Sequence, residues 1–442
     1  MIQRVGDLAR RCMEYKDLVA GSPEERDFLN FIASILDIPN VWLQFSPVEV
    51  LYWRDKGSRL EIDGVVYEVL AMPYSKGGAY EGRLVGIDGD VEGNIVLAPF
   101  PQDVNDAKYV VIKAARRGAS AVVFYGHPQR RIVVTDELGF KYDAAPPPIP
   151  AASAPPEVER ALGKRARLEL AVEARVAYSY NIIAMNSFED TPMISAHYDH
   201  WLYGGSDNCG GLEAAVMAFL DLAAEDYQAA LGLFTAEEGT GPHVPSLYWA
   251  WGSLAYFNRW RPSLLVNIDV AGVGSPKAYA MPYLAEAVKG LLPVEYPRAD
   301  FDSLNYEVRG LPAVTISSLE DTWNIYHSPL DKEIDDEAVS FAAEIAKRLA
   351  KMRPEPPKVD LLQYGVRTRA DPYSAWSVAY NYLVLFKDFN HSDIVYTNVF
   401  DFLRREASKY IRIDLLGGPT LCVNDCNNAL DTYRELAALR LR

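Results

Sequence analysis

Cysteine and histidine are both scarce in this sequence, which has 4 cysteines and 6 histidines among 442 residues. The cysteines are too few and too widely spaced for the disulfide framework of a small secreted domain, so we expect reduced thiols. They are Cys12, Cys209, Cys422 and Cys426. Because imidazole is rare in the chain, a place where histidines gather with carboxylates calls for a chemical explanation.

Long apolar runs are also missing. No uncharged apolar run approaches the roughly 18 residues that a membrane-spanning helix needs, although hydrophobic residues make up 49% of the chain. The N-terminal stretch interleaves charged and apolar residues and lacks the basic start and apolar block of a secretory leader. We therefore expect a soluble protein without a membrane partner, located in the cytoplasm unless an exported precursor has lost its leader.

The sequence has fewer basic than acidic residues. It contains 44 Lys and Arg residues and 60 Asp and Glu residues, which gives a formal net charge of −16. An acidic surface repels the phosphate backbone, and nucleic acid is therefore not an expected partner. A Walker-type glycine loop, a G-x-S-x-G elbow and internal repeats are absent as well. These absences remove the usual sequence signs of phosphate binding and of a serine hydrolase.

The length of the chain exceeds one ordinary core, and we expect two or three domains. Residues 1–45 contain N-terminal helices, and residues 46–173 form a β-rich insertion. Residues 174–352 alternate strands with helices, which predicts an α/β fold with a mixed, mostly parallel, doubly wound sheet flanked by helices. Residues 353–442 comprise a linker and helical segments with many apolar positions, which suit docking or homo-oligomer formation.

The densest group of rare side chains lies in the stretch SAHYDHWLYGGSDNCGG, residues 195–211. It places His197, Asp199 and His200 directly after an apolar strand, and Asp207 at the start of the following helix. Asp199 is expected to accept the second N–H of His197 and thereby fix the tautomer of that imidazole, as outer partners of metal ligands do.

Three predicted strands end in residues that bind metals. MISAH ends in His197, LGLFTAEE carries Glu237 and Glu238, and LLVNID ends in Asp269. His327 follows a fourth strand. Because ligands of open α/β sheets bind at the carboxyl ends of the strands, we expect these side chains to converge on one crevice, together with the nearby helix start.

The adjacent carboxylates of Glu237 and Glu238 repel each other unless a cation is bound or one group stays protonated. Mixed imidazole and carboxylate ligands suit Zn²⁺, although cobalt or manganese can replace it in such sites. Two zinc ions about 3.5 to 4 Å apart polarise a carbonyl and activate a bridging water. We therefore expect the hydrolysis of a carbonyl compound.

Each of these residues also has an ordinary explanation when it is taken alone. Asp207 suits a helix N-cap, His197 a satisfied core histidine, and Glu237 with Glu238 an exposed acidic turn. Together they would require several coincidences in one order and at strand ends, which favours a metal site.

Two further histidines compete with the assigned ligands. His200 follows the H-x-D motif directly, and His243 lies five residues after Glu238. Either could replace an assigned ligand, although we expect both to shape the crevice instead.

The order of the motifs H-x-D, D-N-x-x-G, E-E, D and Y-H resembles that of the co-catalytic di-zinc aminopeptidases. These leucyl aminopeptidase-like zinc exopeptidases are related to glutamate carboxypeptidases. The resemblance covers residues 21–37 and 176–350 and implies the zinc exopeptidase fold. The β-rich stretch between them is similar to the protease-associated domain that many members carry as an insertion. Cys209 departs from the pattern, because a small residue often occupies its position.

The resemblance implies two zinc ions per chain. His197 and Asp269 would hold one ion, Glu238 and His327 would hold the other, and Asp207 would bridge both.

The remaining matches supply the chemistry. Glu237 would be the general base, and Tyr326 would donate a hydrogen bond to the tetrahedral oxyanion. The implied activity is the removal of N-terminal residues from peptides by a metal-activated bridging water, which makes peptides the expected partners.

Three other functions remain open. A metallocarboxypeptidase of the same fold would need cationic groups for a terminal carboxylate, for which Arg259, Arg261, Arg298 and Arg309 are candidates. A non-catalytic interaction protein derived from the fold would tend to lose ligands, and a one-zinc acyltransferase or cyclase would not need all of them. The complete ligand set favours the aminopeptidase.

Overall fold

The structure, a computed structural model, covers most of the chain up to residue 354. It describes residues 5–102, 104–133, 147–189, 191–242, 250–257, 259–280, 282–295, 301–307 and 311–354, and the short strands β16 (Arg412–Ile413) and β17 (Leu421–Cys422). The helical segments expected within residues 353–442 lie outside the described residues, as does His243.

An eight-stranded sheet forms the centre of the fold, in the order β1-β9-β11-β10-β12-β15-β13-β14. Its central strands β11, β10, β12 and β15 run parallel, whereas β1 with β9, β9 with β11, and β13 with β15 pair antiparallel. The fold is therefore mixed α/β with a parallel centre. The strands are β1 (Trp42–Asp55), β9 (Val172–Met185), β10 (Met193–His197), β11 (Ala230–Phe234), β12 (Leu265–Ile268), β13 (Lys277–Ala280), β14 (Val294–Glu295) and β15 (Ala313–Ser317).

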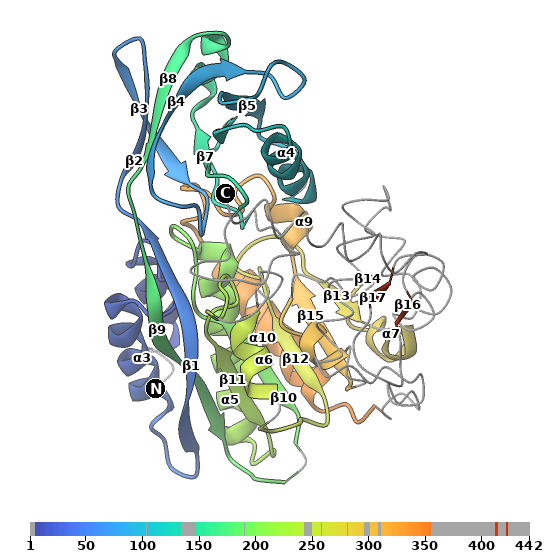
Figure 1. The fold of residues 1–442 in the computed structure, drawn as a ribbon. Coiled ribbons are helices and arrows are strands. Elements are labelled where there is room, and N and C mark those ends of the chain that lie inside the picture. The colour runs from blue at the N-terminus through green and yellow to red at the C-terminus, as the bar shows by residue number, and fades with distance from the viewer. Residues whose placement is uncertain are drawn as a thin grey trace.

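Helices cover both faces of the sheet (Figure 1). Successive side chains of a strand point to opposite faces, so Ile194 joins the core beneath α2, α3, α5 and α10, while Met193 joins the core beneath α6 and α8. The central strands are buried along their whole length, which explains their nearly continuous apolar sequences. The helices are α2 (Leu8–Met13), α3 (Pro23–Leu36), α5 (Gly210–Ala224), α6 (Trp251–Phe257), α7 (Pro282–Val288), α8 (Leu304–Glu307), α9 (Leu319–Thr322) and α10 (Asp336–Ala350).

A closed barrel in the order β2-β3-β7-β6-β5-β4-β8 occupies residues 58–170, inside the range expected for the insertion. Strands β1 and β9 pair over their full length and lead from the sheet to this barrel (Figure 1). Because β1 starts at Trp42 and β9 ends at Met185, this ribbon crosses both expected domain boundaries. The barrel contains β2 (Ser58–Ile62), β3 (Val65–Ala71), β4 (Gly78–Val85), β5 (Ile95–Pro99), α4 (Val104–Arg116), β6 (Ala121–Tyr125), β7 (Ala151–Ala154), the 3-10 helix η1 (Pro156–Ala161) and β8 (Arg165–Leu170).

The expectation of reduced thiols is wrong for two of the cysteines. Cys12 in α2 and Cys209, which directly precedes α5, form a disulfide although 197 residues separate them in sequence. Their Cα atoms lie 5.7 Å apart, within the usual range for a disulfide. The pairing depends on α2 packing beside the start of α5, a contact between distant segments that cysteine spacing does not reveal.

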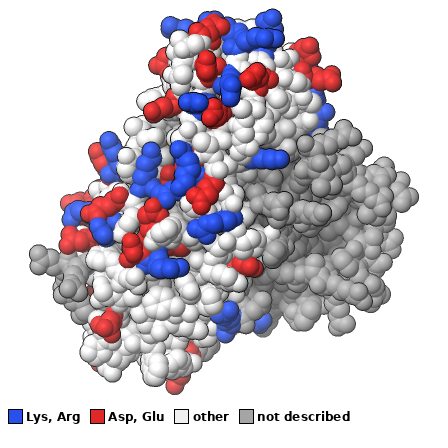
Figure 2. Space-filling view, turned by 60° about the vertical axis from the view of Figure 1, so that its left-hand side comes forward, with Lys and Arg blue, Asp and Glu red and all other residues white. Residues whose placement is uncertain are grey.

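Charges of both signs alternate over the face shown in Figure 2, on the barrel and on the β1–β9 ribbon below it. Exposed pairs include Arg59 with Glu169 at 2.8 Å and Lys164 with Asp63 at 2.9 Å. That face therefore presents no continuous basic stripe of the kind that binds nucleic acid. None of the described helices is long and apolar enough to cross a membrane.

Candidate metal centre

The expected ligands gather at one edge of the central sheet. His197 is the last residue of β10, and Asp269 directly follows β12. Glu237 and Glu238 come shortly after β11. Since these strands are parallel and adjacent, their carboxyl ends lie side by side and bring the side chains together. His327 arrives from the loop after α9.

Two groups of three ligand side chains share Asp207. In the first triad, Nε2 of His197 lies 3.2 Å from Oδ1 of Asp207 and 3.6 Å from Oδ1 of Asp269. In the second triad, Nε2 of His327 lies 2.8 Å from Oδ2 of Asp207 and 2.6 Å from Oε1 of Glu238. Asp207 therefore offers one oxygen to each triad, as a bridging carboxylate does, and all five side chains are buried.

The carboxylates around the two imidazoles favour a bound cation. Burial alone would lower the pKa of both imidazoles, but the surrounding carboxylates outweigh it. Asp269 and Glu237 raise the pKa of His197 well above its ordinary value, and Glu238 with Asp207 raises that of His327 to about 10. Protons thus offset the buried negative charge, and divalent cations bound to imidazole and carboxylate atoms would replace them.

Asp207 is held by the segment η2 (Gly205–Cys209), in which the Asp207–Asn208 peptide bond is cis. The buried carboxylate of Asp331 accepts hydrogen bonds from the N–H of Ser206 at 2.7 Å and from the N–H of Asp207 at 3.2 Å. Gly210 is required next to this segment, because a Cβ there would lie 2.4 Å from the Cα of Gly272. Tight backbone packing and Asp331 thus set the position of the Asp207 carboxylate.

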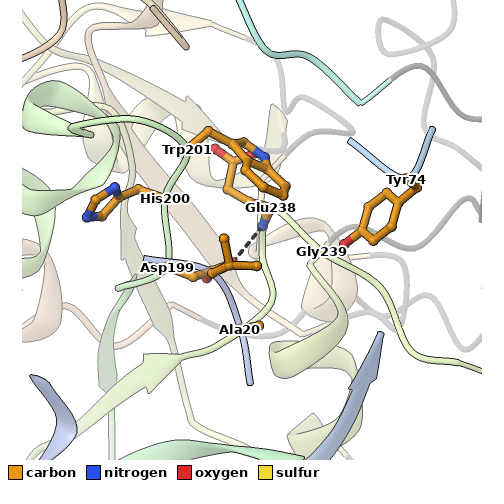
Figure 3. Close-up of a pocket in the computed structure, with 8 residues that line it drawn as sticks. Ala20, Tyr74, Asp199, His200, Trp201, Glu238 and Gly239 are labelled. Atoms are coloured by element: carbon orange, nitrogen blue, oxygen red, sulfur yellow. Dashed lines mark hydrogen bonds between the residues drawn. The ribbon is translucent and has the colours of Figure 1, made fainter. Parts of the chain in front are cut away.

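Asp199 organises the centre through its main chain as well as its side chain. Nδ1 of His197 donates to the main-chain oxygen of Asp199 at 2.9 Å, whereas the carboxylate is 3.9 Å away. The acceptor atom therefore belongs to the main chain of Asp199. The carboxylate accepts the N–H group of Glu237 at 3.1 Å and that of Glu238 at 3.2 Å. Figure 3 shows the second of these hydrogen bonds. Asp199 thus orients one imidazole and the turn that carries both glutamates.

His200 stands apart from both triads. Its ring lies within 4.8 Å of the sulfur atoms of Cys12 and Cys209, and in Figure 3 it points away from Asp199 and Glu238. Burial lowers the pKa of the imidazole to about 4, so the ring is neutral near pH 7. The structure therefore places this competing histidine outside the candidate metal centre.

Tyr326 lies beside the second triad with its ring stacked on the imidazole of His327. The ring centroids are 3.8 Å apart and the planes differ by 14°. Its ring also stacks on Trp323 at 5.5 Å. The stack restrains the orientation of the imidazole, and the oxyanion role of the hydroxyl stays a prediction.

A small cavity lies where the barrel meets the glutamate turn (Figure 3). Its volume is about 10 Å³, roughly that of a single water site, and its lining includes Tyr74, Asp199, Trp201 and Glu238. Tyr74 comes from the barrel, and a Cβ on Gly239 would lie 3.0 Å from its hydroxyl. The cavity is too small for a peptide, and it marks close packing between the barrel and the metal centre.

Three residues near the triads were not expected from the sequence. Asp331 follows His327 by four positions, so its proximity to the Y-H motif is a usable signal. Asp302 is fully buried, and burial with the negative charge of Asp269 raises its pKa to about 7. Arg131 comes from the barrel, and its main-chain oxygen accepts a hydrogen bond from Nδ1 of His327 at 2.7 Å.

Zinc is expected to raise the stability of the folded protein, because it binds ligands that only folding brings together. At about 1,000 times its Kd, such a ligand adds about 4 kcal/mol to the free energy of unfolding. Scanning calorimetry should therefore show a lower Tm after chelation than after zinc addition. The double variant His197→Ala, His327→Ala should lose this difference, and an equal shift in that variant would place the stabilising zinc elsewhere.

Comparison with solved structures identifies the fold. BSAP, a zinc aminopeptidase from Bacillus subtilis, has a TM-score of 0.61 at 18% identity, with 78% of this chain and 93% of that chain covered. The aminopeptidase from Aneurinibacillus sp. strain AM-1 has a TM-score of 0.56 at 19% identity, with 82% and 95% covered. A Peptidase M28 precursor from Shewanella amazonensis has a TM-score of 0.58 at 17% identity, with 81% and 97% covered.

These matches confirm the zinc exopeptidase fold that the motif order implied, and they extend over nearly the whole of each solved chain. At such low identity the likeness establishes the fold and leaves the activity to be argued from the site. No protein-family model matches the sequence, and no curated protein matches it.

Proposed function

We propose that this protein is a zinc-dependent aminopeptidase that removes N-terminal residues from peptides. The observation that carries the proposal is the pair of buried ligand triads that share Asp207, with the carboxylate of Glu237 beside them. A zinc aminopeptidase and a second aminopeptidase are among the solved structures with this fold, which supports the same chemistry here.

His197, Asp207 and Asp269 would hold one zinc ion, and Asp207, Glu238 and His327 would hold the other. When bound, zinc would polarise the scissile carbonyl and lower the pKa of the attacking water. Glu237 accepts a proton from the attacking water, whose oxygen forms a bond to the carbonyl carbon. As the C–N bond breaks, Glu237 returns this proton to the leaving amine. Its Oε2 lies 3.9 Å from Nε2 of His197, close to the triads without belonging to either.

Asp199 and Tyr326 support this step. Asp199 binds His197 through its main-chain oxygen and the N–H of Glu237 through its carboxylate. It therefore fixes the position of the proposed ligand His197 relative to the proposed base Glu237. Tyr326, stacked on His327, is proposed to donate its hydroxyl to the oxyanion that forms at the carbonyl.

The charges near the triads favour an aminopeptidase over a metallocarboxypeptidase. The pKa of Asp302 is about 7, so part of this buried group is ionised at neutral pH, and its ionised form would attract the ammonium group of a free N-terminus. A terminal carboxylate needs a cation instead. Among the candidate cations, Arg259 donates to Ser46 at 2.6 Å, and Arg261 is exposed with a partner of its own. Arg298 and Arg309 lie outside the described residues. The complete triads disfavour a non-catalytic interaction protein and a one-zinc acyltransferase or cyclase.

We further propose that the barrel is a protease-associated type of insertion and that residues 353–442 mediate docking or oligomer formation. The Cys12–Cys209 disulfide is informative about the cellular compartment. Such bonds persist in oxidising compartments and in the cytosol of hyperthermophiles. The disulfide therefore favours one of these settings over the ordinary reducing cytoplasm that the N-terminal sequence suggested.

The deciding experiment counts metal and compares substrates. Elemental mass spectrometry should find about two zinc ions per chain, with fewer in His197→Ala and in His327→Ala. The wild type should cleave a peptide with a free N-terminus and a C-terminal amide, and it should leave the N-acetylated peptide intact. The opposite preference would establish the carboxypeptidase, and a chain that takes up no zinc would favour the interaction protein.

A further inference from the structure

The barrel segment that follows β6, residues 126–133, reaches the metal centre. The N–H of Arg131 donates to the main-chain oxygen of His327 at 2.9 Å, and Nδ1 of His327 donates to the main-chain oxygen of Arg131 at 2.7 Å. The neighbouring Arg130 donates to the main-chain oxygen of Tyr326 and lies 5.3 Å over the ring of Trp323. Consecutive barrel residues thus hold the loop that carries His327.

These contacts fix both the ring and the backbone of His327. A carbonyl oxygen only accepts hydrogen bonds, so Arg131 keeps a proton on Nδ1 and leaves Nε2 as the atom that faces a metal. His327 has φ of 50°, a left-handed conformation that is costly for a residue other than glycine. Its paired hydrogen bonds with Arg131 oppose relaxation of this backbone, and Nε2 stays directed at Asp207 and Glu238.

The side chain of Arg131 anchors the segment in the interior. It is 4% exposed and pairs with Asp17 and with Asp55, whose Oδ2 lies 3.1 Å from Nη2. Asp17 also accepts the N–H of Leu202 at 2.7 Å, in the loop that follows His197. A planar guanidinium serves two carboxylates at once, and removing it leaves buried charge without a partner. The anchor therefore joins the barrel, the N-terminal segment and the metal centre.

We propose that Arg131 is a positioning residue of the metal centre and that barrel docking sets the affinity of the metal held by Glu238 and His327. The proposal rests on the proposed zinc centre and does not depend on peptidase activity. The insertion is then part of the centre, because the barrel and not the central sheet supplies the acceptor for Nδ1 of His327. Metal binding should in turn favour docking of residues 126–133, since such coupling is reciprocal.

The test is a calorimetric zinc titration of the metal-free full-length protein. The wild type should bind two ions, and Arg131→Met should weaken one of them by about 10- to 100-fold, the usual effect of losing an outer partner of a ligand. Arg131→Lys should have a smaller effect in the same direction, because an ammonium group cannot span both carboxylates. Arg59→Met is the matched control, because Arg59 pairs with Glu169 on the exposed surface of the barrel. This variant should bind zinc like the wild type.

Combined variants identify the weakened site. In the His197→Ala background, Arg131→Met should weaken the remaining ion by the same factor. In the His327→Ala background it should change nothing further, because the ligand it positions is gone. Circular dichroism verifies folding, and Arg131→Lys keeps the test decisive if Arg131→Met fails to fold.

The outcomes separate the coupling from the zinc centre. If the folded Arg131 variants bound both ions with wild-type affinity, the proposed coupling between barrel docking and zinc affinity would be wrong. The proposed zinc centre would be unaffected by that result. Equal weakening in both histidine backgrounds would overturn the coupling too, because it would show general damage. A wild-type chain that binds no zinc would overturn the zinc centre, and the coupling with it.

Discussion

Replacing Glu237 by glutamine is expected to lower kcat for peptide hydrolysis by about 100- to 10,000-fold while both zinc ions stay bound. Glutamine has nearly the shape of glutamate but cannot take the proton of the attacking water. Glu237 belongs to neither triad, so the loss of its charge should spare metal binding. Steady-state kinetics with an N-terminally free peptide and zinc analysis of the same sample measure the two effects.

Glu238→Gln is the matched comparison, because the two glutamates are adjacent and differ in their expected roles. Oε1 of Glu238 lies 2.6 Å from Nε2 of His327, so this variant should lose affinity for one zinc ion together with activity. If Glu237→Gln kept the wild-type kcat with two zinc ions, another group would be the base. If it lost zinc as Glu238→Gln does, Glu237 would be a ligand.

The convergence of His197 and Asp269 at one edge of the sheet could be predicted, because it follows from the geometry of parallel strands. β10 and β12 are neighbours, so a residue at the end of each, His197 and Asp269, must lie at the same edge. Buried strands also have short apolar sequences with clear ends, which made the strand ends easy to locate. His327 is expected at the same edge because it follows a fourth strand, although a loop and α9 separate it from β15.

The partners that orient these ligands could not be predicted, because they depend on contacts between distant segments. Arg131 lies 196 positions from His327 and acts on it through main-chain atoms, which carry no residue-specific signal. For the same reason the sequence could not specify that the main-chain oxygen of Asp199 is the atom that holds His197. The strand order of the barrel was equally hidden, because short β-rich runs specify strands but not their neighbours.

Removing the disulfide is expected to lower the free energy of unfolding by about 2–5 kcal/mol, because its long loop restricts the unfolded chain. The bond ties α2 to Cys209, two positions after Asp207, and so also restrains the segment that carries Asp207. Cys12→Ser and Cys209→Ser should each lower the Tm by the same amount. Urea unfolding of metal-free protein isolates this effect from that of zinc.

Dithiothreitol provides the internal control for this prediction, because it should lower the Tm of the wild type to that of Cys12→Ser and leave the variant unchanged. Peptide mapping without reduction should recover Cys12 linked to Cys209. If the Tm of the wild type instead stayed unchanged with dithiothreitol while both thiols reacted with an alkylating reagent, the two cysteines would be reduced in solution. That result would remove the support for an oxidising or hyperthermophilic setting, whereas the two ligand triads, which contain no cysteine, would be unaffected.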